Sequence, residues 1–404
     1  MQRPVRPQFA SNCLAACLLK SPNRMKRNVN LDLMRVIAVL MVIFGHLPDA
    51  PRDLPGPIVW AADIFRHYGG LGVDLFFVLS GFLVSGLLFR EYFTRGRADV
   101  RRFLIRRGFK IYPAFYVFVI VTVLLRLRFG DTLTARDIVS ELLFVQNYGP
   151  HVWSHTWSLA VEEHFYLLLA AIVAALCHWV PRAPLARIPR FFWLTTILVF
   201  LARAWTIAHA PYATPTHRFP THLQIDSLFT GVILAYYFYT RESLAAFVRR
   251  RWFPIALAGL ALVVAAQAIS DPATKYLLGH LMTNAGFAAL VIVGVVAAPA
   301  LGAFGRGAAW VGAQSYSIYL WHAAVLGIGG VVVEHFAGRP LSFLETAGWY
   351  VPTSFVSGVI AAKVVELPAL RLRDRLFPDG RRGPALPNAA DPVTSAVSVG
   401  PAIT

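Results

Sequence analysis

The chain has 404 residues, of which 57% are hydrophobic and only 15% are charged. A soluble globular protein of this size would carry more charge, so the composition excludes an ordinary water-soluble domain. The net charge of +17 would suit a nucleic-acid-binding protein, but the Lys and Arg residues fall between long apolar runs. We therefore expect a lipid bilayer, and no nucleic acid, as the partner.

Apolar segments long enough to cross a bilayer as helices recur from one end of the chain to the other. The predicted fold is an all-α integral membrane protein, a polytopic bundle of about ten transmembrane helices. In chain order, the predicted spans are 31–47, 70–89, 111–128, 157–178, 192–209, 223–239, 253–270, 280–300, 310–333 and 343–365.

The 38 Lys and Arg residues indicate how these spans are oriented. Most of them lie before residue 30, after residue 370, or in the connections 90–110, 180–191 and 241–252. Because cytoplasmic connections carry the excess of basic residues, both termini of the multi-pass bundle are predicted to be cytoplasmic. We expect three parts, namely a disordered basic extension (1–29), the membrane domain (30–370) and a disordered tail (371–404).

The first predicted span carries two ionisable side chains, Arg35 near its start and His46 near its end. A helix makes about three turns between these positions, so both side chains point the same way, about 16 Å apart along the axis. Ionisable groups inside a membrane span are costly and usually functional, and a neutral imidazole is a common general base. The alternatives are a structural His46 and an Arg35 that simply pairs with Asp32, one turn earlier.

The next two polar regions lie on opposite sides of the predicted bundle. The connection 90–110 holds more basic residues than topology needs, which predicts an anionic partner, either phospholipid headgroups or a soluble polyphosphate ligand. The connection 129–156 holds amide, aromatic and imidazole side chains, His155 among them. These side chains suit either a carbohydrate or an interfacial aromatic belt.

Four acidic residues lie in or beside predicted spans: Asp74, Glu162, Glu163 and Asp226. A buried carboxylate must pair or take a proton, so each could orient His46, pair with Arg35 or Arg203, or accept a hydroxyl of a substrate. His322 is interpreted as a packing residue. The three Cys residues lack metal-ligand spacing, and zinc, phosphate-loop and serine-hydrolase motifs are absent, so we expect no metal site and a direct group transfer.

The order of these blocks resembles the membrane acyltransferase-3 family, bacterial O-acyltransferases that modify surface glycans. The resemblance runs from Asn30 to Pro368, and Lys110 departs from it where an arginine is more usual. It rests on Arg35 with His46, Gly72-Val-Asp-Leu-Phe-Phe-Val-Leu-Ser-Gly-Phe82, the basic block from Arg106 to Pro113, Trp157-Ser-Leu-Ala-Val-Glu-Glu163, the Asp226 segment, Ser315-Tyr-Ser-Ile-Tyr-Leu-Trp-His322 and Val365-Glu-Leu-Pro368.

The resemblance implies ten core helices, an acyl-CoA co-substrate taken from the cytoplasm, no tightly bound cofactor, and a glycan or glycolipid hydroxyl as acceptor. Acetyl is the expected acyl group, with succinyl as the alternative. His46 would take the proton from the acceptor hydroxyl, oriented by Glu162 or Asp74. The side chains expected to bind acyl-CoA are Arg35, Arg106, Arg107 and Lys110. Those expected to bind the acceptor are Trp157, Asp226 and His155.

Two other classes of function fit the residues less well. A transporter or flippase of a lipid-linked or small anionic solute would use the same charges without bond chemistry, but no internal repeat is visible. A sensory or assembly protein with a decayed site would have no reason to carry Arg35, His46 and the carboxylates together. The acceptor stays open among O-antigen, exopolysaccharide, a periplasmic glucan, a lipid-linked oligosaccharide and a secreted macrolide, and the residues do not specify an oligomeric state.

Overall fold

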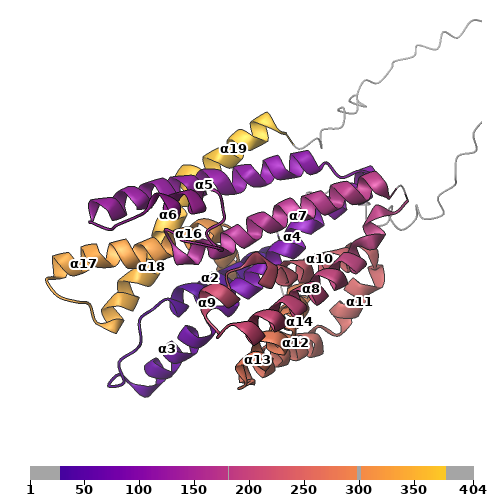
Figure 1. The fold of residues 1–404 in the computed structure, drawn as a ribbon. Coiled ribbons are helices and arrows are strands. Elements are labelled where there is room, and N and C mark those ends of the chain that lie inside the picture. The colour runs from indigo at the N-terminus through magenta and orange to yellow at the C-terminus, as the bar shows by residue number, and fades with distance from the viewer. Residues whose placement is uncertain (1–27, 181, 298–301, 379–404) are drawn as a thin grey trace, which may run out of the picture.

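A computed structural model describes residues 28–180, 182–297 and 302–378, and every regular element in these ranges is helical (Figure 1). The first half contains α2 (Val29–Gly45), α3 (Gly56–Tyr68), α4 (Leu71–Arg95), α5 (Val100–Arg128), α6 (Ala135–Leu142), α7 (Trp157–Trp179) and α8 (Ile188–His209). The second half contains α9 (Thr214–His217), α10 (Ile225–Thr240), α11 (Glu242–Arg250), α12 (Trp252–Ala268), α13 (Pro272–Thr274), α14 (His280–Val296), α15 (Ala303–Gly312), α16 (Ser315–Ala324), α17 (Gly330–Ala337), α18 (Phe343–Ala361) and α19 (Leu367–Leu376).

Short turns extend several of these helices. One-turn π-helical segments join α13 to α14, α16 to α17 and α18 to α19, at Lys275–Gly279, Val325–Gly329 and Ala362–Glu366. Turns of 3₁₀ helix precede α7, α8 and α10, at Ser154–Thr156, Pro184–Arg187 and Thr221–Leu223.

In the part of the chain that the structure describes, each predicted span is mostly helical, with a break at residues 313–314 in the span 310–333, and the count of about ten is not confirmed. Within the described residues, six helical stretches are long and apolar enough to cross a bilayer, and a seventh counts if α11 and α12, which meet at 87°, form one span. Several of the others are short, since α2 and α12 have 17 residues each and α10 has 16. The six stretches are Leu71–Arg95, Val100–Arg128, Ser154–Trp179, Pro184–His209, Pro272–Val296 and Ser315–Ala337.

The basic segment 90–110, predicted as a connection, is mostly helical. α4 continues to Arg95 and ends at Gly96, whose φ of 70° is a left-handed conformation that favours glycine. α5 starts at Val100, where the Asp99 side chain accepts a hydrogen bond from the Arg102 amide. The chain therefore reverses within a few residues, and the basic side chains of this segment project from a helix.

The predicted boundaries of the membrane domain need one correction. Helix α19 reaches Leu376, so residues 371–376 are helical and are not part of a disordered tail. Residues 1–27 and 379–404, which hold most of the two predicted extensions, lie outside the described residues.

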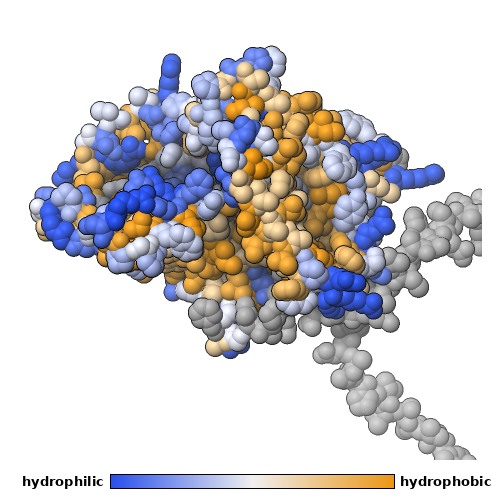
Figure 2. Space-filling model, turned by 90° about the horizontal axis from the view of Figure 1, so that it is seen from below, coloured by the Kyte–Doolittle hydropathy of each residue, from blue (hydrophilic) through white to orange (hydrophobic). Residues whose placement is uncertain are grey.

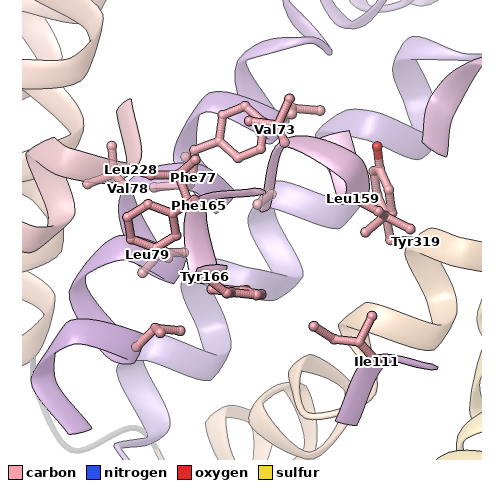
Figure 3. Packing of buried hydrophobic residues seen from close by; sticks show 14 of the residues in the cluster. Val73, Phe77, Val78, Leu79, Ile111, Leu159, Phe165, Tyr166, Leu228 and Tyr319 are labelled. Atoms are coloured by element: carbon pink, nitrogen blue, oxygen red, sulfur yellow. The ribbon is translucent and has the colours of Figure 1, made fainter. Parts of the chain in front are cut away.

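The core forms where α4 packs between α2, α7 and α10. The residues labelled in Figure 3 come mainly from α4 and α7, together with Leu228 of α10, Ile111 of α5 and Tyr319 of α16. α4 and α10 meet at two glycines. A Cβ atom on Gly81 would overlap the Leu228 carbonyl group, and one on Gly231 would overlap the backbone of Val78 and Phe82. Small residues at such crossings let two helix backbones come into contact, which gains packing energy inside a membrane.

The outer surface carries large apolar side chains that water would not favour. On α8, Ile197, Leu198 and Leu201 are each more than half exposed. Figure 2 shows hydrophobic residues gathered across the middle of one face and hydrophilic residues toward its ends. Together with the apolar helices, this distribution is that of a multi-pass membrane protein.

The glycine contact yields a stability prediction. Gly231→Ala should lower the free energy of unfolding by about 1–3 kcal/mol, because the new methyl group forces α4 and α10 apart. Thermal unfolding in detergent measures the change. The matched control is Gly307→Ala on α15, where nothing lies within 4 Å of the new Cβ. If the two variants unfold at the same temperature, the close α4–α10 contact does not contribute to the stability of the bundle.

Candidate active site

Helix α2 holds Arg35 toward one end and His46 at the other. The helix begins after Asn28, whose side chain accepts a hydrogen bond from the Asn30 amide. It ends at Gly45, which meets the end of α3 so closely that a Cβ on Gly69, the C-cap of α3, would lie 2.6 Å from the Gly45 Cα. His46 follows as the C-terminal cap and is exposed, with its Nδ1 2.8 Å from the Val42 carbonyl oxygen.

Cations from α2 and α5 gather around Arg35. Arg35 forms an ion pair with Asp32 at 2.8 Å, which confirms the pairing predicted as an alternative. The charges of Arg107 and Lys110 on α5 also interact with that of Arg35. We call Arg35, Arg107 and Lys110 the cation cluster.

The cations of the basic block differ in how closely acidic or aromatic side chains approach them. Lys110 binds Glu366, which also accepts a hydrogen bond from Ser317 at 2.6 Å. Arg106 lies 3.3 Å from Asp374 and donates to the Phe377 carbonyl oxygen. The guanidinium group of Arg107 lies over the ring of Tyr166, 5.8 Å from its centroid.

The carboxylates expected to orient His46 form hydrogen bonds with other side chains in the structure. Glu162 accepts hydrogen bonds from Ser80 at 2.7 Å and Tyr166 at 3.0 Å. Asp74 accepts two from Arg218, at 3.0 and 3.1 Å. The group that fixes the His46 ring is instead the Val42 carbonyl of the preceding turn.

Glu162 belongs to the surroundings of the cation cluster. Its charge interacts with those of Arg35 and Arg107, so it offsets part of their repulsion. It also interacts with Tyr316 and Tyr319 on α16. The neighbouring Glu163 accepts a hydrogen bond from Tyr112. Glu162 on α7 therefore interacts both with the cation cluster and with polar groups of α16.

Three imidazoles lie close together at the His46 end of α2. The ring centroids of His46 and His322 are 4.9 Å apart, and those of His322 and His155 are 5.0 Å apart. We call His46, His155 and His322 the histidine cluster. Tyr319 supports it, because its hydroxyl donates to the His155 carbonyl oxygen at 2.8 Å and lies 2.6 Å from Ser158 Oγ.

His322 was interpreted as a packing residue, so sequence reasoning missed its position beside His46. His322 is the last residue of Ser315–His322, one of the motifs on which the family resemblance rests, and this was the one indication in the sequence of a functional role. Its spacing from His46 along the chain gave no indication of contact.

The side chains expected to bind an acceptor are mostly buried. His155 belongs to the histidine cluster, and Trp157 stacks on Phe219 with ring centroids 5.2 Å apart. Asp226 is 1% exposed and ion-paired with Arg203 at 2.9 Å, with His280 3.5 Å away. Asp226 therefore forms a buried ion pair that joins α10 to α8, and its role in binding an acceptor stays a prediction. Among the described residues, no three His, Cys, Asp or Glu side chains are arranged to hold a metal ion.

This bundle of apolar helices encloses cations, carboxylates and imidazoles, as do membrane enzymes and transporters that act on polar molecules. The model of the acyltransferase-3 family, described as an acyltransferase domain, matches residues 28–365. The chain therefore belongs to this family of acyl-transferring enzymes, as its motifs predict.

Curated relatives carry related names. The chain is 26% identical over 334 residues to the peptidoglycan O-acetyltransferase OatA of Listeria monocytogenes, covering 76% of this chain and 50% of the relative. It is 26% identical over 323 residues to the O-acetyltransferase OatA of Staphylococcus aureus, covering 73% of this chain and 50% of that relative. It is 27% identical over 338 residues to the putative peptidoglycan O-acetyltransferase YrhL of Bacillus subtilis, covering 77% and 50%. The chain thus spans about half the length of these relatives, and no solved structure matches it.

Glu141 of α6, outside the spanning helices, yields a pH prediction. Burial raises the pKa of this fully buried carboxyl from 4.5 to about 7, although the Val152 amide donates to it. A raised pKa stabilises the fold fully below pH 4.5, and this contribution is lost as the pH rises through 7. Glu141→Gln, which keeps the side chain neutral, should therefore gain stability over the natural chain above pH 7, on the order of 3 kcal/mol.

Thermal unfolding between pH 5 and 9 measures this difference. The control is Glu242→Gln, at the exposed start of α11, whose difference from the natural chain should not grow with pH. A constant difference for Glu141→Gln would contradict the raised pKa.

Proposed function

We propose that this chain is an integral membrane O-acyltransferase that moves an acyl group from cytoplasmic acyl-CoA to a hydroxyl of a cell-wall or exported glycan. Membership of the family supports acyl transfer. The relatives named O-acetyltransferases favour acetyl as the group and acetyl-CoA as the donor, and two of their names favour a peptidoglycan-like acceptor. In this proposal the Arg35 end of α2 faces the cytoplasm of a bacterial inner membrane, as the basic residues predict.

The observation that carries the proposal is the division of α2 between two clusters. Arg35, whose charge interacts with those of Arg107 and Lys110, lies toward one end of the helix, and His46 lies beside His322 at the other, about 16 Å from Arg35 by helix rise. Coenzyme A has anionic phosphates at one end and a thioester at the end of a long, narrow arm. Arg35 and Arg107 would bind the phosphates, Lys110 and Arg106 would add positive potential, and the arm would reach toward His46.

The state of the His46 ring suits a general base. A carbonyl oxygen only accepts hydrogen bonds, so the nitrogen that faces Val42 carries the hydrogen and Nε2 keeps its lone pair. Nε2 would take the proton of the acceptor hydroxyl as its oxygen bonds to the thioester carbonyl carbon. The carbon–sulfur bond then breaks, and His46 returns the proton to the sulfur, which leaves as the CoA thiol.

The proposal predicts different losses at the two ends of α2. His46→Ala should lower kcat by about 10²–10⁴-fold, because it removes the base. Arg35→Ala should instead raise KM for acetyl-CoA by roughly 10–100-fold, because it removes a charge-assisted contact with the donor. Both are measured on purified protein with acetyl-CoA and a chito-oligosaccharide, and in cells by mass spectrometry of surface glycans.

The controls are His335→Ala on α17 and Arg250→Ala on α11, both exposed and outside the two clusters. Full glycan acylation by both His46→Ala and Arg35→Ala, in protein shown to insert normally, would end the proposal. Acetyl-CoA binding separates it from a transporter or flippase, which has no reason to recognise this donor.

A further inference from the structure

The three rings of the histidine cluster share one feature, which is that the backbone sets their tautomers. Each ring has one nitrogen within hydrogen-bonding distance of a backbone carbonyl oxygen. His46 Nδ1 faces the carbonyl of Val42, His155 Nε2 faces that of Leu320, and His322 Nδ1 faces that of Tyr319. Because a carbonyl oxygen cannot donate, each of these nitrogens carries the ring hydrogen. The other nitrogen of each neutral ring is then a lone pair.

Two of these lone pairs are enclosed. His322 Nε2 and His155 Nδ1 are buried and have no hydrogen-bond partner among the described residues. Buried polar atoms in folded proteins are nearly always paired, so an unpaired acceptor needs a donor that comes from elsewhere. The nearest ring to His322 on another helix is His46, packed edge-to-face at 4.9 Å and 75°.

We propose that His322 is a positioning residue for His46 and supplies the hydrogen-bond acceptor that Glu162 and Asp74 do not. This inference rests on the proposed role of His46 as base. Once His46 takes the hydroxyl proton, its ring has two N–H groups. Nδ1–H donates to Val42, and Nε2–H can donate to the lone pair of His322 until the proton passes to the leaving sulfur.

A neutral acceptor suits this step. An ionised carboxylate in the same place would form a buried ion pair with the imidazolium, and breaking a buried pair to release the proton is costly. A neutral imidazole stabilises the positive charge of the His46 imidazolium less strongly than a carboxylate would. His46 can therefore still protonate the thiolate and complete the transfer.

The other charged groups around His46 have partners of their own. On α3, Arg66 binds Asp49 and the Leu47 carbonyl oxygen, and on α4 Asp74 binds Arg218. α14 and α15 approach α2 near its other end, at Met34 and Asp32. Other titratable groups on the elements packed against α2 are His155 and Tyr319 beside His322, Tyr350 and Glu345 on α18, Tyr316 on α16, and Asp63, His67 and Tyr68 on α3. Glu345 is ion-paired with Arg339 and Asp63 with Arg52, and Tyr316 donates to the Ile111 carbonyl oxygen.

The test compares His322→Phe with His322→Gln, in full-length protein with acetyl-CoA and a chito-oligosaccharide. Phenylalanine keeps the ring packing and removes the lone pair. It should lower kcat about tenfold, leave KM for acetyl-CoA unchanged and move the acid limb of the pH–rate profile about one pH unit lower. Glutamine can donate to the Tyr319 carbonyl and still present an acceptor oxygen, so it should recover most of kcat and return the limb toward its original position.

An unmoved acid limb in His322→Phe, or a glutamine variant as impaired as the phenylalanine variant, would show that His322 only packs. Nitrogen-15 NMR of the histidine side chains tests the inference without the reaction. The His46 signal, assigned by its loss in His46→Ala, should titrate at lower pH in His322→Phe than in the natural chain. An identical titration overturns the inference even if acyl transfer is confirmed, and a shifted one supports the contact even if the chain transfers no acyl group.

Discussion

A charge inside an apolar bundle must be compensated by groups of the same bundle, and this requirement governs the interior described here. Asp226 is paired with Arg203, Asp74 with Arg218, and Lys110 with Glu366. Around Arg35 and Arg107 the compensation is shared among Asp32, Glu162 and the face of Tyr166. The charges of Arg35 and Arg107 also repel each other, and the phosphates of the proposed donor would offset this repulsion.

The same requirement explains why the imidazoles occupy the other end of α2. A neutral histidine needs one acceptor for its N–H, and a backbone carbonyl supplies it without adding charge. Val42, Leu320 and Tyr319 do this for the three rings. The cluster can therefore lie partly buried without counter-ions and gain a charge only when a proton arrives.

The sequence was sufficient for features that depend on local spacing. Helical periodicity placed Arg35 and His46 on one helix, and the spacing of Asp32 from Arg35 indicated their ion pair. The start of α5 was not predicted, because the density of basic residues suggested a connection, although Asp99 is a residue type that favours the N-cap position. The resemblance to the family covered nearly the whole matched region, since apolar spans and short motifs survive at about a quarter identity.

Features that depend on contacts between distant segments could not be predicted. Which carboxylate meets which cation is decided by how far each helix is rotated, so Glu162 faces Ser80 and Asp74 faces Arg218. His46 and His322 come together only because α16 packs against α2. Hydropathy also does not show where a helix stops short, which is why ten predicted spans correspond to fewer helices of full membrane length.

The central claim is that one helix joins a donor-binding cation cluster to a catalytic imidazole. A cryo-electron microscopy structure in lipid nanodiscs with a non-cleavable thioether analogue of acetyl-CoA tests it most directly. We expect phosphate density at Arg35 and Arg107, with the acyl end of the analogue within hydrogen-bonding reach of His46. An analogue bound with its acyl end away from His46, or with its phosphates away from Arg35 and Arg107, would contradict it.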